Sequence, residues 1–166
     1  MDPVRSSLVG GVVATISVAA LLFVVDLLLG GTDTIVLATF SSACLVGGPP
    51  FCEVGSTTAT VVNVVVFAAL FAVAWPLLFA GFTWGLPGES GIAHGAVFGL
   101  VLWTGYLVVV WATIARGWEP VSTELPTLAI LALAYLLYGV ILGGTYDYFA
   151  EHRTLLILED DVEPAA

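Results

Sequence analysis

Few side chains in this 166-residue chain could take part in chemistry, and three of them lie in or beside long apolar runs. Asp26 lies near the end of one run, Asn63 lies within a second, and His94 lies at the start of a third. A carboxylate inside a membrane-spanning helix is costly and often functional, so Asp26 is either a polar packing contact or a group that handles ions or protons. The His94 imidazole either shuttles protons or senses pH, or it satisfies hydrogen bonds at a helix end.

The two cysteines, Cys44 and Cys52, are separated by seven residues that include the turn-forming Gly47-Gly48-Pro49-Pro50. Reactive cysteine pairs of membrane thiol oxidoreductases are often spaced as C-x-x-C, which this pair is not. The spacing favours a structural disulfide that closes a small loop. The alternative is that the two cysteines are buried free thiols.

The remaining polar residues exclude several kinds of site. A haem held by two histidines in a helical bundle needs one from each of two spans, and His152 lies beyond the last apolar run. A structural zinc site needs about four suitably spaced ligands. The chain contains no phosphate-binding glycine loop, nucleophile elbow or H-E-x-x-H motif. We therefore expect no cofactor, no metal and no enzyme active site.

The elements that carry these residues are predicted from hydropathy. Hydrophobic residues make up 60% of the chain and the mean hydropathy is +1.09, whereas a soluble domain is about 45–50% apolar. About 20 apolar residues cross a ~30 Å hydrocarbon core at 1.5 Å per residue. Four stretches are long enough, and they predict an all-α, membrane-embedded bundle of four transmembrane helices at about residues 8–29, 58–81, 90–114 and 125–146.

We assign residues 1–153 to one four-span membrane domain and residues 154–166 to an acidic C-terminal tail. Between the first two spans, residues 35–45 are apolar but too short to cross, which predicts a short interfacial or re-entrant helix. In the second span, the pair Trp75-Pro76 predicts a kink, because proline removes a backbone donor.

Glycines recur every four residues in the last two spans, as Gly91, Gly95 and Gly99 and then as Gly139 and Gly143. Residues four apart share one side of a helix, and a glycine stripe lets another helix backbone approach closely in lipid. The pattern predicts close helix packing, within one protomer or between copies. The alternative is that these glycines line a narrow path.

The charge balance excludes one class of partner. The chain has thirteen acidic residues, three arginines and no lysine. Without a basic patch, nucleic-acid binding is not expected. The lipid bilayer is the expected surrounding, and a homo-oligomer or another membrane protein is the expected partner. An acidic, lysine-free surface also predicts a halophilic host with a salty cytoplasm.

Arginine placement predicts the orientation in the cell membrane. Four spans place both termini on one side, where Arg5 and Arg153 lie, and Arg116 lies on the other. Because positive residues favour the cytoplasm, we expect both termini to be cytoplasmic. Cys44 and Cys52 then face outward, where a disulfide can persist.

Three segments resemble a family of small four-helix membrane proteins of unknown function, frequent in halophilic archaea and some bacteria. They are VGGVVAT at the start of the first span, GIAHGAVFGLVLW in the third and YGVILGGTYDY at the end of the fourth. The resemblance covers about residues 8–149 and implies four spans and membrane residence. It supplies no catalytic residues.

Together these features predict a multi-pass membrane protein that is not an enzyme. We expect a structural or accessory protein that packs with itself or with other membrane proteins. The alternative is a small oligomeric transporter or channel that uses Asp26 or Asn63.

Overall fold

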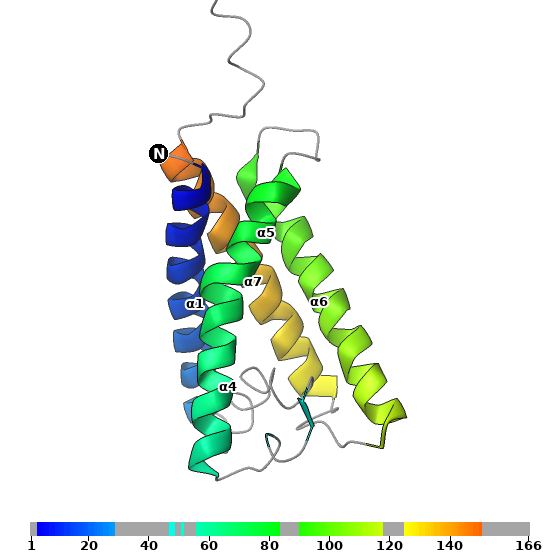
Figure 1. Ribbon diagram of the computed structural model, residues 1–166. Helices are drawn as coiled ribbons and strands as arrows, with labels where there is room; N and C mark the ends of the chain where they lie inside the picture. Colours follow the sequence, from blue (N-terminus) through cyan, green and yellow to red (C-terminus); the bar gives the residue numbers. More distant parts are fainter. Residues whose placement is uncertain are drawn as a thin grey trace, which may run out of the picture.

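The computed structural model describes residues 3–28, 47–48, 51, 56–83, 90–117 and 125–150, which are helical almost throughout (Figure 1). The prediction of an all-α bundle with four long apolar helices is confirmed. The elements in chain order are α1 (Pro3–Leu28), α4 (Thr57–Ala69), a π-helical turn η1 (Leu70–Ala74), α5 (Trp75–Phe82), α6 (Gly91–Ala115) and α7 (Leu125–Ala150).

Each of the four predicted spans corresponds to a helix that is long and apolar enough to cross a membrane. Their bounds are Val4–Leu28, Thr57–Phe82, Gly91–Ala115 and Leu125–Ala150. The first helix begins earlier than predicted and the fourth ends later. Hydropathy marks the part of a helix that fits the hydrocarbon core, whereas the hydrogen-bond ladder of α1 continues through the polar Arg5, Ser6 and Ser7.

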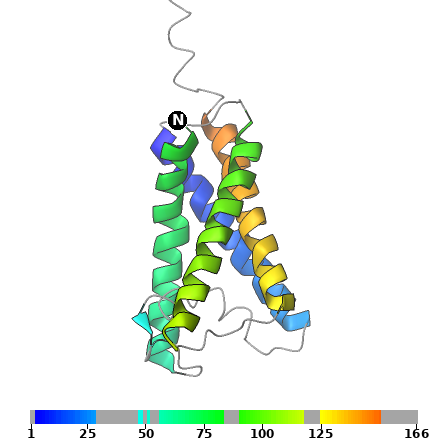
Figure 2. The same cartoon turned by 90° about the vertical axis from the view of Figure 1, so that its right-hand side faces the viewer.

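Helix α7 lies between α1 and α6, and it runs antiparallel to both (Figures 1 and 2). The closest helix pairs are α6 with α7 and α1 with α7, while η1 and α5 pack on α1. The start of α1 and the end of α7 lie at the same end of the bundle, which we name the terminal end. The helices are close together there and diverge toward the opposite end, which we name the wide end.

The core and the outer surface are both apolar, as expected when lipid is the solvent. The core cluster takes buried side chains from every span: Ala14, Val18, Leu22, Phe67, Phe71, Phe79, Phe98, Ala134, Tyr138 and Leu142. Large apolar side chains also point outward, and Ile16, Val65 and Leu133 are each about three-fifths exposed. These outward faces suit contact with acyl chains.

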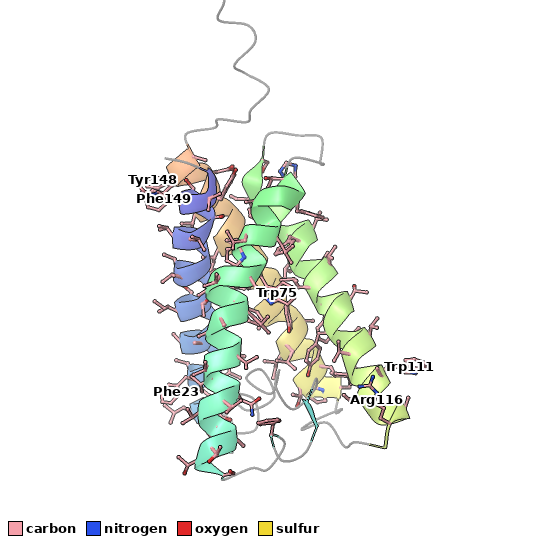
Figure 3. All side chains as sticks on the ribbon, viewed as in Figure 1. Phe23, Trp75, Trp111, Arg116, Tyr148 and Phe149 are labelled. Carbon is pink, nitrogen blue, oxygen red and sulfur yellow. The ribbon has the colours of Figure 1, made fainter. Side chains whose placement is uncertain are left out.

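Exposed aromatic residues mark the two ends of the bundle (Figure 3). Tyr148 and Phe149 lie at the terminal end of α7, and Tyr148 is 80% exposed. Trp111 lies near the wide end of α6, close to Arg116 in sequence, and is 72% exposed. Tyrosine and tryptophan are enriched at membrane–water interfaces, so these positions fit an interfacial belt on each side.

Some predicted features lie outside the described residues. These are Cys44 and Cys52, the predicted short helix at residues 35–45 and the acidic tail at residues 154–166. The disulfide and the short helix therefore stay predictions.

Candidate functional site

The contact between α6 and α7 is made by backbone against backbone. A Cβ atom added to Gly95 would overlap the carbonyl oxygen of Gly139, and one added to Gly139 would overlap the carbonyl oxygen of Gly95. A Cβ atom added to Gly143 would overlap the carbonyl oxygen of Gly91, whereas one added to Gly91 would overlap the Asp147 carboxylate. The structure thus brings the glycines of the two spans together within one protomer, at a separation that only glycine permits.

The seam extends toward the wide end at Gly99, where an added Cβ would overlap the carbonyl oxygen of Tyr135. Further along α6, Gly105 has nothing within 4 Å of such an added atom. We name the contact of Gly91, Gly95 and Gly99 with α7 the glycine seam. It is a packing contact and leaves no room for a path between the two helices.

At the terminal end, a carboxylate from α7 binds the start of α6. Asp147 Oδ2 accepts a hydrogen bond from the Gly91 backbone N–H at 2.6 Å. Ser90 caps the same helix through its Oγ, which accepts from the Ala93 N–H at 3.4 Å. The first N–H groups of a helix lack intrahelical partners and carry partial positive charge, so an aspartate here satisfies a donor and opposes the helix dipole.

His94 lies one turn into α6 at this same end and is half-buried. Asp26 lies in the last turns of α1, at the wide end. The structure therefore keeps the two titratable candidates at opposite ends of the bundle and does not combine them in one site.

In the second span, the middle of the helix changes to π geometry immediately before Pro76. The Trp75 N–H donates to the Leu70 carbonyl five residues earlier instead of to Phe71. The freed Phe71 carbonyl accepts a hydrogen bond from the Tyr138 hydroxyl of α7 at 2.6 Å. Tyr138 is fully buried, so this bond satisfies two polar groups that lipid could not.

Pro76 itself packs on α1 at a glycine. A Cβ atom added to Gly11 would overlap the ring of Pro76 and would lie 3.1 Å from the Ala72 carbonyl oxygen. The predicted kink at Trp75-Pro76 thus takes the form of a π turn followed by a proline that sits against the Gly11 backbone. Trp75 lies in the middle of the bundle (Figure 3).

Asn63 joins α4 to the connection that precedes it. Its Nδ2 donates to the Phe51 carbonyl and to the Ala59 carbonyl, each at 2.9 Å, and the residue is only 4% exposed. Phe51 belongs to a turn in which its N–H donates to the Gly48 carbonyl at 3.0 Å, and Gly48 has a φ of 66° that favours glycine. The amide hydrogens of Asn63 are thus engaged with backbone.

Asp26 differs from these residues. It is 4% exposed, and among the described residues its Oδ1 has no hydrogen-bond partner. It follows Ala14, Val18 and Leu22 along the buried side of α1 and therefore faces the protein instead of lipid. A buried carboxylate oxygen without a donor is energetically costly, which makes Asp26 the strongest candidate for a functional group in the spans.

Aromatic rings from three spans meet below the π turn, toward the wide end. Phe67 stacks on Phe71 with ring centroids 4.4 Å apart, and Phe71 contacts Tyr135 at 5.7 Å. Tyr135 in turn contacts Trp103 and Tyr106 of α6 at 6.2 and 5.7 Å. This cluster links the second span to the α6–α7 pair, and Phe79 makes a second link nearer the terminal end through Phe98 and Tyr146.

Sequence reasoning missed Tyr138. The Trp75-Pro76 pair indicated a bend, but the residues that hold it come from two other helices. An apolar run gives no sign that one of its tyrosines faces a free carbonyl. Asp147, in the last turn of the fourth span, binds the start of the third span through the Gly91 N–H.

In the part of the chain that the structure describes, no group of three or more histidine, cysteine, aspartate or glutamate side chains could hold a metal ion. The polar groups lie apart, most of them bound to backbone. Four apolar helices packed in this way fit a small multi-pass membrane protein.

The chain belongs to a family of unknown function, DUF6789, which matches residues 1–157. No curated protein and no solved structure matches the chain.

Proposed function

We propose that this protein is a multi-pass membrane protein with a structural or accessory role, and that it packs with itself or with other membrane proteins instead of catalysing a reaction. The observation that carries the proposal is that polar side chains of the spans form hydrogen bonds with the protein's own backbone. Tyr138, Asn63 and Asp147 each bind backbone groups of the chain itself. Catalysis needs several polar groups that converge on one position, and these three hold the fold together.

The glycine seam supports the same role, because it is a rigid contact inside the protomer. Partners must therefore use the outer faces, which are apolar. Val65 of α4 and Val108 of α6 are 60% and 61% exposed and point away from the core. Membrane helices associate through packing of such surfaces.

Site-specific photo-crosslinking in native membranes tests this proposal. A photoreactive residue is placed at Val65 or Val108, and at Ile16 of α1, which is 64% exposed, as a third face. We expect one face to give a discrete protein adduct, with a second copy or with one partner, and the others to give lipid adducts. Native mass spectrometry of mildly solubilised protein then gives the stoichiometry. Lipid adducts from all three faces and a lone protomer would contradict the proposal.

Transport is the second candidate, and Asp26 is the observation that favours it. An intramembrane carboxylate with an unsatisfied oxygen could bind a cation or a proton during transport. Asn63 is a weaker candidate because its amide hydrogens are engaged. The test is ion and proton flux into liposomes. Flux in the natural protein that is lost in Asp26→Asn but kept in Asp147→Asn supports transport; no flux of any small ion argues against it.

We further propose that both termini are cytoplasmic and that Cys44 and Cys52 form an outward-facing disulfide. Support comes from Arg5 at the terminal end and Arg116 at the wide end. A C-terminal reporter active only in the cytoplasm tests the orientation. Intact mass with and without reductant tests the disulfide.

The acidic, lysine-free composition supports a halophilic setting. We expect the protein to melt at a higher temperature in molar salt than in dilute buffer. Equal melting in both would count against this setting.

A further inference from the structure

The π turn divides the second span into two helices, α4 and α5. The regular i to i−4 backbone hydrogen bonding of an α-helix is interrupted between them. Two carbonyls at the division lack ordinary α-helical donors. Phe71 loses its donor because Trp75 donates to Leu70, and Ala72 loses its donor because Pro76 has no N–H. A helix is most easily bent where its ladder is interrupted, and π bulges and prolines are the usual causes of sharp kinks.

The two helices on either side of the turn have different surroundings. Helix α5 and η1 pack on α1, where Pro76 lies against Gly11. Helix α4 diverges from α1, α6 and α7 toward the wide end (Figures 1 and 2). On its outer side, Val61, Val64 and Val65 are exposed. The inner side of α4 is buried, and Asn63 there binds the Phe51 turn. One helix is therefore packed on α1, and the other, held by different contacts, extends from the turn as an arm.

One hydrogen bond fixes the arm at the division. Tyr138 reaches from α7 to the Phe71 carbonyl, the group that the π turn sets free. Tyr138 also contacts the Phe71 ring edge-on at 5.0 Å, and Phe71 stacks on Phe67 of α4. The contact thus runs from the rigid α6–α7 pair through the turn to the arm.

We propose that η1 is a hinge about which α4 pivots as a rigid arm, and that the Tyr138–Phe71 hydrogen bond latches α4 in the observed position. Release of the latch lets the free Phe71 and Ala72 carbonyls adjust locally and changes the distance of α4 from α6 and α7 at the wide end. This hinge does not depend on which proposed function is correct, because it rests on geometry within the protomer.

Pulsed electron–electron double resonance in lipid nanodiscs measures the distribution of distances between two spin labels, and this distribution reports the motion of the arm. Spin labels attached to noncanonical residues at the exposed positions Thr58 of α4 and Val108 of α6 report on the arm, and such labels leave the cysteines intact. A second pair at Val101 of α6 and Leu133 of α7 reports on the frame. The frame distance should stay fixed because the glycine seam joins those helices.

The test variant is Tyr138→Phe, which removes the latching hydroxyl and keeps the ring. The matched control is Tyr135→Phe, because the Tyr135 hydroxyl makes no hydrogen bond within the described residues. We expect the population of displaced arm conformers to rise about fivefold in Tyr138→Phe, as loss of one hydrogen bond allows. In Tyr135→Phe, the distribution should match that of the natural protein.

A third variant works in the opposite direction and keeps the test decisive if Tyr138→Phe does not fold. Pro76→Ala restores a backbone N–H that the Ala72 carbonyl can accept, so the arm distribution should become narrower. Unchanged distributions in both Tyr138→Phe and Pro76→Ala would overturn the hinge. Equal broadening in Tyr138→Phe and Tyr135→Phe would overturn the latch.

Discussion

The α6–α7 pair and the second span are both long and apolar enough to cross a membrane, but they are held in the bundle in different ways. In the pair, backbone touches backbone at Gly95 and Gly139, so neither helix can shift without overlap. In the second span, a tyrosine hydroxyl and a proline ring connect η1 and α5 to α7 and α1. Close contacts between glycines give a rigid frame, whereas side-chain contacts permit adjustment. The comparison separates a frame from an element that can move on it.

The largest expected effect breaks the frame. Gly95→Leu places a side chain where the Gly139 carbonyl lies, so we expect a loss of about 3 kcal/mol or more in unfolding free energy. Reversible unfolding in mixed micelles measures it. Gly105→Leu is the matched control, because an added atom there meets nothing, and it should change stability by less than about 0.5 kcal/mol. Equal melting of the two variants would contradict the seam.

The next effect compares the two regions directly. Gly11→Ala and Gly95→Ala each add one methyl group at an occupied position, but Gly11 faces the Pro76 ring whereas Gly95 faces backbone. We expect Gly11→Ala to cost about 1–2 kcal/mol and Gly95→Ala to cost more, because the second span can shift on the frame. Gly81→Ala, where the space is open, is the control. A larger cost at Gly11 would reverse the assignment of the rigid and adjustable regions.

A smaller effect concerns the end of the frame. Asp147→Ala removes the acceptor for the Gly91 N–H and the charge that opposes the α6 dipole, with an expected loss of about 1–2 kcal/mol. Asp147→Asn keeps an acceptor oxygen and should recover part of this loss. The same unfolding measurement applies. If neither variant differs from the natural protein, the bond contributes nothing to the frame.

The smallest effect has the opposite sign. Asp26→Asn replaces a buried carboxyl group, whose Oδ1 has no donor among the described residues, with an amide, so we expect a gain of up to about 1 kcal/mol. Asp147→Asn should instead lower the unfolding free energy. The two variants are therefore expected to change stability in opposite directions. A clear loss of stability in Asp26→Asn would show that this carboxylate has a structural partner.

The four spans could be predicted because hydropathy over about 20 residues depends only on local composition. Their helical ends were less accurate, since α1 continues into Arg5 and Ser6, which hydropathy assigns to the flank. Glycine spacing in α6 predicts a close contact. That the contact joins α6 to α7 depends on the antiparallel register, which sets Gly95 opposite Gly139.

The candidate site was less predictable because its contacts join distant parts of the chain. Asn63 reads as an isolated polar residue in an apolar run, and its acceptor is the backbone of Phe51 in the preceding connection. The Trp75-Pro76 pair predicts a bend. The π turn that forms there leaves the Phe71 carbonyl without a helical donor. Its hydrogen bond comes from the hydroxyl of Tyr138, which lies 67 residues further along the chain. Sequence reasoning finds such groups but not their partners.

The divergence of the helices has a consequence for the surrounding lipid. The bundle is narrow at the level of the chain ends and broad at the opposite level (Figures 1 and 2). A wedge of this shape displaces a smaller area from one leaflet than from the other. If the helices span a bilayer as proposed, the two monolayers experience unequal lateral crowding around each molecule, and a bilayer rich in this protein favours bending toward the side that carries the termini.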